Sequence, residues 1–337
     1  MRFGYVPLAE AVGAISAHAV RAGEVVLRKG SLLTAEMAAR LEAAGVTGLV
    51  AARLDADDVH EDDAAARLAA RLAGAHIRVD PPFTGRANLF AEQAGVLALE
   101  RGRIDRVNAV DEAITFATLP AFRAVSPGEM VATVKIIPYA VPRSALEAAL
   151  AEAAAPLIRV APFKGKRVAV LSTLLPGLKP SVVSKTLDVL AQRLAPAGGS
   201  IVFEERVAHE TQALAEALPR ALAAGPDIVI VFGASAISDR RDVIPAAVEA
   251  AGGRIEHLGM PVDPGNLLLL AAIGEAQVVG APGCARSPKE NGFDWVLRRL
   301  LADLPVGRAE VVAMGVGGLL MEIKTRPQPR AEPPPAS

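Results

Sequence analysis

Short apolar runs alternate with helical patterns along the second half of the chain. The runs lie at residues 167–172, 227–232 and 276–280, with weaker ones at 200–205 and 310–315. Runs of this length, separated by helices, are typical of strands in a parallel sheet that is buried on both faces. We therefore expect residues 156–322 to form a three-layer α/β domain around a parallel or mixed sheet.

Apolar residues at helical spacing predict three helices between these runs. The first apolar stripe consists of Val183, Leu187, Leu190 and Leu194, on a helix that Pro180 is placed to begin. The second consists of Leu214, Leu218 and Leu222. Pro219 lies inside it, and because a proline in mid-helix costs about 3 kcal/mol, we expect a kink or a break there. A third helix is expected over residues 292–303.

The first half of the chain is less regular and predicts a smaller α+β region over residues 1–155, with a break near residue 55. Residues 25–54 have the pattern of strand, turn, helix and strand, with Thr34 as N-cap and Gly45 just past the helix. Three more helices are predicted, each after a capping residue: Asp58, Asn88 and Asn108. Alternation over 129–141 predicts a half-buried strand.

The ends of these regions are marked by composition. An alanine-rich helical pattern over 144–155 gives way at Pro156, where we place the boundary between the two domains. Residues 323–337 are rich in proline and have little to bury, so we expect a disordered tail.

Charge and cysteine content exclude several classes of function and of site. Lys and Arg number 36 against 37 Asp and Glu, so the chain lacks the broad basic field that nucleic acids or anionic membranes attract. No apolar run approaches the roughly 18 residues that span a bilayer, and the N-terminal residues lack a signal-peptide pattern, so we expect a cytoplasmic location. The only cysteine, Cys284, excludes an internal disulfide and an all-cysteine metal site.

Loops that follow strands are the places to look for chemistry, because ligands of open parallel sheets bind beyond the carboxyl ends of the strands. The loop after 227–232 carries small residues and then two acids: Gly233, Ala234, Ser235, Asp239 and Asp242. Small residues let a ligand approach the backbone, and two carboxylates three residues apart can share Mg²⁺. Alternatively, the acids only complement a helix dipole, worth about 0.3–1 kcal/mol each.

Two further loops are candidates. The first, before an apolar run, contains Asp263, Pro264, Gly265 and Asn266, although a Pro-Gly step is most often only a turn. The second precedes a helix and contains Gly283, Cys284, Arg286, Ser287, Lys289 and Asn291. Glycine, hydroxyl and cationic groups before a helix favour a phosphate cradle, and a solvated loop is the alternative. A helix start would also lower the pKa of the Cys284 thiol.

The order of these segments resembles the molybdopterin-binding domain shared by molybdenum-cofactor biosynthesis proteins. In that family a strand leads into a glycine-rich turn with a serine and an aspartate before a helix, and two Pro-Gly loops follow. The resemblance covers about residues 160–305. Residues 25–50 also resemble the segment that precedes this domain in molybdopterin molybdotransferases. Stand-alone or fused molybdopterin-binding proteins of bacteria are the nearest kind of match.

The resemblance implies roles only at matched positions. Gly233 and Ser235 match the glycine-rich turn, and Asp242 matches the aspartate, with Asp239 as its neighbour. The two Pro-Gly loops are matched by Pro264 with Gly265 and by Pro282 with Gly283. Ala234 replaces the second glycine of the family, and residues 174–179 lack the carboxylates of the family's Thr-Gly-Asp-Glu run. Ligand binding is therefore favoured over molybdate transfer.

These matches lead to a functional hypothesis with open alternatives. The chain is expected to bind molybdopterin or the molybdenum cofactor during its biosynthesis or maturation, with the phosphate or an attached nucleotide held by 233–242, 263–266 and 283–291. Asp239 and Asp242 would orient Mg²⁺. Whether the chain is catalytic stays open: it is either a molybdotransferase-like enzyme or a carrier that passes cofactor to a nucleotidyltransferase or molybdoenzyme. Because related domains are often oligomers, we also expect a homo-oligomer.

Two other classes of function remain. One is a nucleotide pyrophosphatase of the ADP-ribose type, like the competence-damage-inducible proteins, which share the same pattern. The other is a regulatory or interaction protein that retains the fold without the site.

Overall fold

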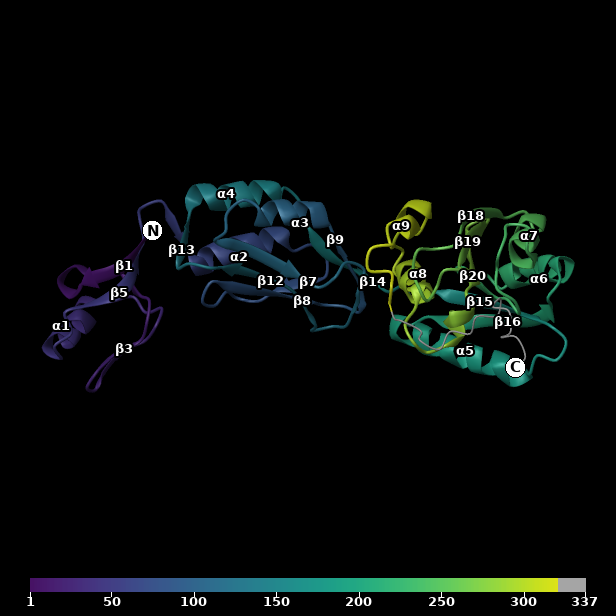
Figure 1. Ribbon diagram of the computed structural model, residues 1–337, viewed down its shortest axis with the longest axis horizontal. Helices are drawn as coiled ribbons and strands as arrows, with labels where there is room; N and C mark the ends of the chain where they lie inside the picture. Colours follow the sequence, from purple (N-terminus) through teal and green to yellow (C-terminus); the bar gives the residue numbers. More distant parts are fainter. Residues whose placement is uncertain (321–337) are drawn as a thin grey trace, which may run out of the picture. The chain divides into compact units, whose positions relative to one another are not determined.

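The computed structural model describes residues 1–320, so the tail expected at 323–337 lies outside the described residues. The chain divides into two compact units, the first from Met1 to Pro162 and the second from Phe163 onward (Figure 1). No helix within residues 1–320 is long and apolar enough to cross a membrane.

The C-terminal unit is built on a six-stranded sheet with the strand order β16-β15-β17-β20-β19-β18. Its strands are β15 (Arg167–Leu174), β16 (Ser200–Ala208), β17 (Ile228–Phe232), β18 (Arg254–Leu258), β19 (Leu269–Ile273) and β20 (Ala276–Ala281). β16, β15, β17 and β20 are parallel, whereas β19 is antiparallel to both of its neighbours. The sheet is therefore mixed, as the sequence allowed.

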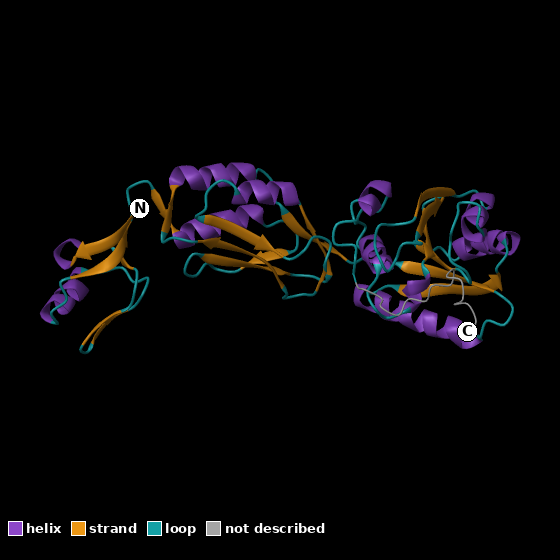
Figure 2. Cartoon of the chain, viewed as in Figure 1, coloured by secondary structure: helices purple, strands orange, loops and turns teal. Residues whose placement is uncertain are grey.

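Helices cover both faces of this sheet (Figure 2). The helices are α5 (Pro180–Leu194), α6 (Thr211–Ala223), α7 (Val243–Ala250) and α8 (Gly292–Leu301). Alternate strand residues point to opposite faces: Val168 and Val170 pack with α5 and α8, while Ala169 and Leu171 pack with α6 and α7. The predicted three-layer α/β domain is confirmed.

Two local expectations in this unit differ from the structure. Of the kink or break expected at Pro219, the break is wrong, because helix α6 continues through this residue. Pro219 lies on the exposed side of α6, so the carbonyl that loses its N–H partner can face water. The apolar run at 310–315 is not a strand, because it overlaps the short helix α9 (Arg308–Val312). The Glu310 carboxylate accepts from the N–H of Gly307 at 2.8 Å and closes the first turn of α9.

The first 54 residues include the strand, turn, helix and strand that were predicted for residues 25–54. They contain β1 (Arg2–Pro7), the 3₁₀ turn η1 (Leu8–Glu10), β2 (Ile15–Ser16), β3 (Val20–Ala22), β4 (Val25–Leu27), α1 (Ala35–Ala43) and β5 (Gly48–Arg53). The Thr34 hydroxyl caps α1 by accepting from the N–H of Met37 at 3.2 Å. Gly45 has a φ of +83°, which suits glycine just past a helix.

The rest of the N-terminal unit packs helices against short antiparallel sheets ordered β10-β12-β8-β7, β11-β9-β14 and β13-β6. The strands are β6 (Asp58–His60), β7 (Ile77–Val79), β8 (Arg86–Ala91), β9 (Gly95–Leu99), β10 (Ile114–Thr118), β11 (Ala124–Val125), β12 (Met130–Ile136), β13 (Ala140–Pro142) and β14 (Ile158–Pro162). The helices are α2 (Glu61–Leu72), α3 (Arg101–Asn108) and α4 (Arg143–Glu152). The strand expected within 129–141 is confirmed as β12.

The three caps predicted in this part are wrong. Helix α2 exists, but His60 caps it, since Asp58 belongs to strand β6. Asn88 lies within strand β8, where buried residues alternate with exposed or half-buried ones, so the helix predicted after it is wrong. Asn108 ends α3, and its side chain accepts from the N–H of Phe116 at 2.7 Å and donates to the Phe116 carbonyl at 3.0 Å. The amide of Asn108 therefore joins a helix end to a strand.

Candidate functional site

The predicted loops converge at one edge of the C-terminal sheet. β15, β17 and β20 run in the same direction, so their carboxyl ends lie together. β18 also points this way, because it is antiparallel to β19, which is antiparallel to β20. We call this the carboxyl edge, and its loops are 175–179, 233–242, 259–268 and 282–291.

The turn after β17 is anchored on β15. The N–H of Ala234 donates to the Thr173 hydroxyl at 2.8 Å, and this oxygen also lies 2.8 Å from His209 Nδ1. A Cβ on Gly233 would lie 2.7 Å from the Ser235 carbonyl oxygen and 2.8 Å from a methyl of Ile244. The turn at Gly233, Ala234 and Ser235 is therefore tight at Gly233, and Ser235 is exposed.

The two acids of this loop accept local hydrogen bonds. Asp242 caps α7, accepting from the N–H of Val243 at 2.8 Å and from that of Ser238 at 3.1 Å through its other oxygen. One oxygen of Asp239 accepts from both the side chain and the N–H of Arg241, at 2.7 and 2.9 Å. The hydrogen bond from the Arg241 side chain lowers the pKa of Asp239.

This arrangement matches the interpretation in which the acids organise the start of a helix. Within the described residues, no side chain bonds to both carboxylates and so brings them together. Within residues 1–320, no three His, Cys, Asp or Glu side chains gather where they could hold a metal ion.

Arg286 connects the loop after β20 to the rest of the edge. Its guanidinium donates to the Gly233 carbonyl and to the Thr186 hydroxyl, both at 2.9 Å. It also lies 5.4 Å from the centre of the Phe232 ring, and burial lowers the pKa of Arg286. The cation predicted to meet a phosphate therefore holds two loops and α5 together.

A second arginine, Arg193 of α5, fixes the same loop from the other side. Its guanidinium forms an ion pair with Asp294 at 2.7 Å, and both side chains are about nine-tenths buried. It also donates to the carbonyls of Ala285 and Ser287 at 2.7 Å each. Since the loop is held along its length, it presents a fixed surface.

The other predicted members of this loop divide into buried and exposed groups. Asn291 is buried as the N-cap of α8, accepting from the N–H of Phe293 at 3.1 Å. Lys289 is exposed and Ser287 is half-buried, with the Lys289 N–H 3.3 Å from the Ser287 hydroxyl. Lys289 and Ser287 are therefore the side chains of this loop that remain open to a ligand.

The first Pro-Gly loop packs closely on the start of α8. The N–H of Gly292 donates to the Pro264 carbonyl at 2.8 Å. Gly265 has a φ of +142°, and a Cβ there would lie 2.8 Å from the backbone of Gly292. The Asp263 N–H donates to the Gly318 carbonyl at 2.8 Å, and the Asp263 carbonyl accepts from the N–H of Leu320 at 2.9 Å. Gly265 is thus required by packing, and the exposed Asn266 ends the loop.

The prediction that the Cys284 thiol has a lowered pKa is wrong. Residues Gly283–Arg286 form only a short 3₁₀ turn, and Cys284 is half-buried. Burial raises the pKa of the Cys284 thiol, so the group is a neutral thiol at physiological pH.

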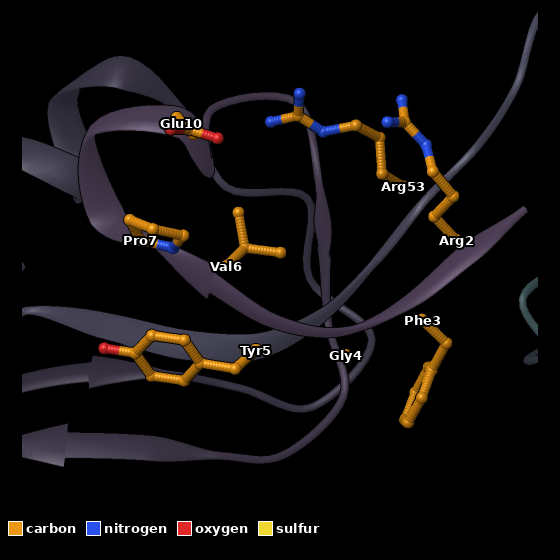
Figure 3. Close-up of a pocket in the computed structure, with 8 residues that line it drawn as sticks. All are labelled: Arg2, Phe3, Gly4, Tyr5, Val6, Pro7, Glu10 and Arg53. Atoms are coloured by element: carbon orange, nitrogen blue, oxygen red, sulfur yellow. The ribbon is translucent and has the colours of Figure 1, made fainter.

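A pocket lies on the N-terminal unit (Figure 3). It measures about 210 Å³ and is lined by Arg2, Phe3, Gly4, Tyr5, Val6, Pro7, Glu10 and Arg53. Figure 3 shows the Arg2 and Arg53 side chains extending side by side, as expected of residues paired across β1 and β5. Its polar side chains are exposed or half-exposed, so nothing buried there marks a ligand.

Residues 169–303 match the family described as “probable molybdopterin binding domain”. None of the curated proteins matches the chain.

Three solved structures show a distant likeness. A molybdopterin biosynthesis MoeA protein from Pyrococcus horikosii is 15% identical over 90% of this chain and 75% of its own, with a TM-score of 0.32. The CinA protein from Thermoplasma acidophilum is 16% identical over 41% and 98%, with a TM-score of 0.32. A putative molybdenum cofactor biosynthesis protein from Corynebacterium diphtheriae is 13% identical over 42% and 99%, with a TM-score of 0.28. TM-scores this low carry no information about function.

Proposed function

We propose that this chain, whose residues 169–303 match the molybdopterin-binding family, binds molybdopterin or the molybdenum cofactor at the carboxyl edge. The family match over 169–303 carries this proposal. The convergence of the three matched loops at one edge of the sheet supports it. The role lies in the biosynthesis or maturation of the cofactor.

The terminal phosphate of the pterin binds between the turn after β17 and the loop after β20. Small residues at Gly233, Ala234 and Ser235 leave room for it near the backbone. Lys289 supplies an exposed cation and Ser287 a hydroxyl. Charge-assisted hydrogen bonds of this kind contribute roughly 1.5–3 kcal/mol each, so a local cluster can hold a dianion on a nearly neutral protein.

Arg286 and Arg193 prepare this surface before a ligand arrives. Their hydrogen bonds fix the loop after β20 to the Gly233 carbonyl, to α5 and to α8. A loop that is already ordered loses little conformational freedom on binding, and this favours affinity.

The chain acts as a carrier that passes the cofactor to a nucleotidyltransferase or a molybdoenzyme. Asp239 and Asp242 are engaged with Arg241, Val243 and Ser238. The loop after β15, residues 175–179, contains no carboxylate. These observations favour holding the pterin over inserting metal into it.

Expression in two hosts tests the proposal. The protein is purified from a host that makes molybdopterin and from one that cannot, then denatured and oxidised to release any pterin in fluorescent form. We expect pterin fluorescence from the first preparation only, reduced several-fold by Lys289→Ala. Arg254→Ala is the matched control, because Arg254 is exposed at the amino end of β18. Equal fluorescence from both hosts would contradict the proposal.

A further inference from the structure

A second pocket lies at the same edge of this sheet, at the carboxyl ends of β15 and β16. It measures about 400 Å³ and is lined by Leu174, Leu175, Pro176, Arg206, Val207, Ala208, His209 and Glu210. This volume falls within the roughly 300–1,000 Å³ of small-molecule sites. None of these residues lies in the loops 233–242, 263–266 and 283–291.

His209 is held in a defined orientation at the wall of this pocket. Its Nδ1 lies 2.8 Å from the Thr173 hydroxyl, and its backbone N–H donates to the Leu174 carbonyl at 2.9 Å. The Thr173 oxygen already accepts from the N–H of Ala234 at 2.8 Å. In the tautomer in which the Thr173 O–H donates to Nδ1, the ring proton lies on Nε2. The proposal uses this tautomer, in which Nε2 is a donor for a ligand.

The pocket combines an apolar wall with polar groups. Leu175 and Pro176 present exposed apolar surface, Leu175 being 47% exposed. Glu210 precedes α6, and its carboxylate makes no capping hydrogen bond to that helix. Arg206 is oriented by Glu204, at 2.8 Å. An apolar wall facing a donor and an acceptor suits a flat heterocycle with a polar edge.

We propose that this pocket takes the 2-amino-4-oxopyrimidine ring that pterins and guanine share. His209 Nε2 donates to the ring carbonyl, and the Glu210 carboxylate accepts from the neighbouring ring N–H and amino group. This inference rests on the proposed function, because it places the ring of the same ligand whose phosphate lies at Gly233–Ser235. Thr173 links the two parts, since its hydroxyl contacts both His209 and Ala234.

Fluorescence titration with 6-hydroxymethylpterin, a probe without phosphate, tests the pocket. We expect saturable binding that GMP competes for and AMP does not. Glu210→Gln should weaken probe binding about tenfold or more, since one charged hydrogen bond is worth at least about 1.4 kcal/mol. Glu210→Gln leaves the protein folded, because the Glu210 side chain supports no cap. His209→Ala should weaken binding similarly, and Ala208→Trp should block it, since Ala208 is exposed at the wall.

Glu249→Gln, on the exposed side of α7, is the matched control and should bind like the parent protein. Unchanged probe affinity in the Glu210 and Ala208 variants, or equal competition by AMP and GMP, overturns the ring pocket. If pterin still co-purifies from the molybdopterin-producing host, the proposed function survives that result. Absence of both probe binding and co-purified pterin defeats the proposed function itself.

Discussion

Arg286 donates a hydrogen bond of 2.9 Å to the carbonyl oxygen of Gly233 and thereby joins the loop after β20 to the turn after β17. Both segments lie within residues 169–303, the part of the chain that matches the molybdopterin-binding family, although they are about 50 residues apart in the sequence. The contact makes the carboxyl edge one surface. Several consequences of this arrangement can be measured.

Replacing Arg286 should loosen the whole edge. Arg286→Ala leaves the carbonyl of Gly233 and the hydroxyl of Thr186 without this donor, so the free energy of unfolding should fall by about 2–4 kcal/mol. The unfolding free energy of Arg286→Lys should lie between those of the parent protein and Arg286→Ala, because an ammonium cannot reproduce the planar fork of the guanidinium. Urea denaturation measures both variants, and Arg240→Ala, an exposed change nearby, should be within about 0.5 kcal/mol of the parent protein. Equal stability of Arg286→Ala and Arg240→Ala would count against this role.

The Thr173 hydroxyl should contribute measurably to the free energy of unfolding, although it is a small group. Thr173→Val keeps the shape but removes the partner of Ala234 and His209, which predicts a loss of about 1–3 kcal/mol in unfolding free energy. Thr173→Ser retains the oxygen and should recover most of that loss. Thermal or urea unfolding of the pair decides the point. A serine variant as unstable as the valine variant would assign the effect to packing.

Gly265 should tolerate no side chain. Gly265→Ala meets the backbone of Gly292 and requires a φ that L residues rarely adopt, so we expect a loss of about 2 kcal/mol or more. Gly283→Ala provides the comparison, because a Cβ on Gly283 meets nothing within 4 Å. Denaturation midpoints should separate the two variants clearly. Similar midpoints would show that the first Pro-Gly loop can move away from α8.

Asp242 should behave as a helix cap. Asp242→Ala removes both accepted hydrogen bonds and should lower the unfolding free energy by about 1 kcal/mol, while Asp242→Asn should lower it by only a few tenths. Incubation with ADP-ribose and Mg²⁺ adds a functional readout, for which we expect no hydrolysis. Turnover that Asp242→Asn abolishes would instead support a nucleotide pyrophosphatase.

Cys284 should react slowly with thiol reagents near neutral pH. Burial raises the pKa of its thiol, so little thiolate is present below the ordinary pKa of about 8.5. The unfolded chain ionises first as pH rises past that value, and the folded protein should therefore lose stability in that range. Alkylation rates in buffer and in urea test this, with Cys284→Ser as the blank. Faster reaction in buffer than in urea would contradict the raised pKa.

Periodicity located the central strands and three helices of the C-terminal unit, because these strands are buried on both faces and these helices are amphipathic. The stripe from Val183 to Leu194 became α5, and the apolar runs at 167–172, 227–232 and 276–280 became β15, β17 and β20. In the N-terminal unit the polar residues misled the prediction. Asn88 lies in a strand, and Asn108 bonds across to Phe116, contacts that depend on residues distant in sequence.

In the candidate site, too, local features were predicted and contacts between distant residues were not. The loops at Gly233, Gly265 and Gly283 were found from local patterns, because turns and small residues follow strand ends. The contacts that hold them were missed, since nothing in the sequence pairs Thr173 with His209 or Arg193 with Asp294. The exposure that separates Lys289 from Asn291 also depends on how α8 packs.

Anaerobic titration calorimetry with molybdopterin tests the central claim most directly. The account predicts saturable binding with one site per chain, weakened by Lys289→Ala and by Arg286→Ala under conditions where both variants are folded. Heat no greater than that of dilution into buffer would contradict it, and the edge would then be a retained fold without a ligand.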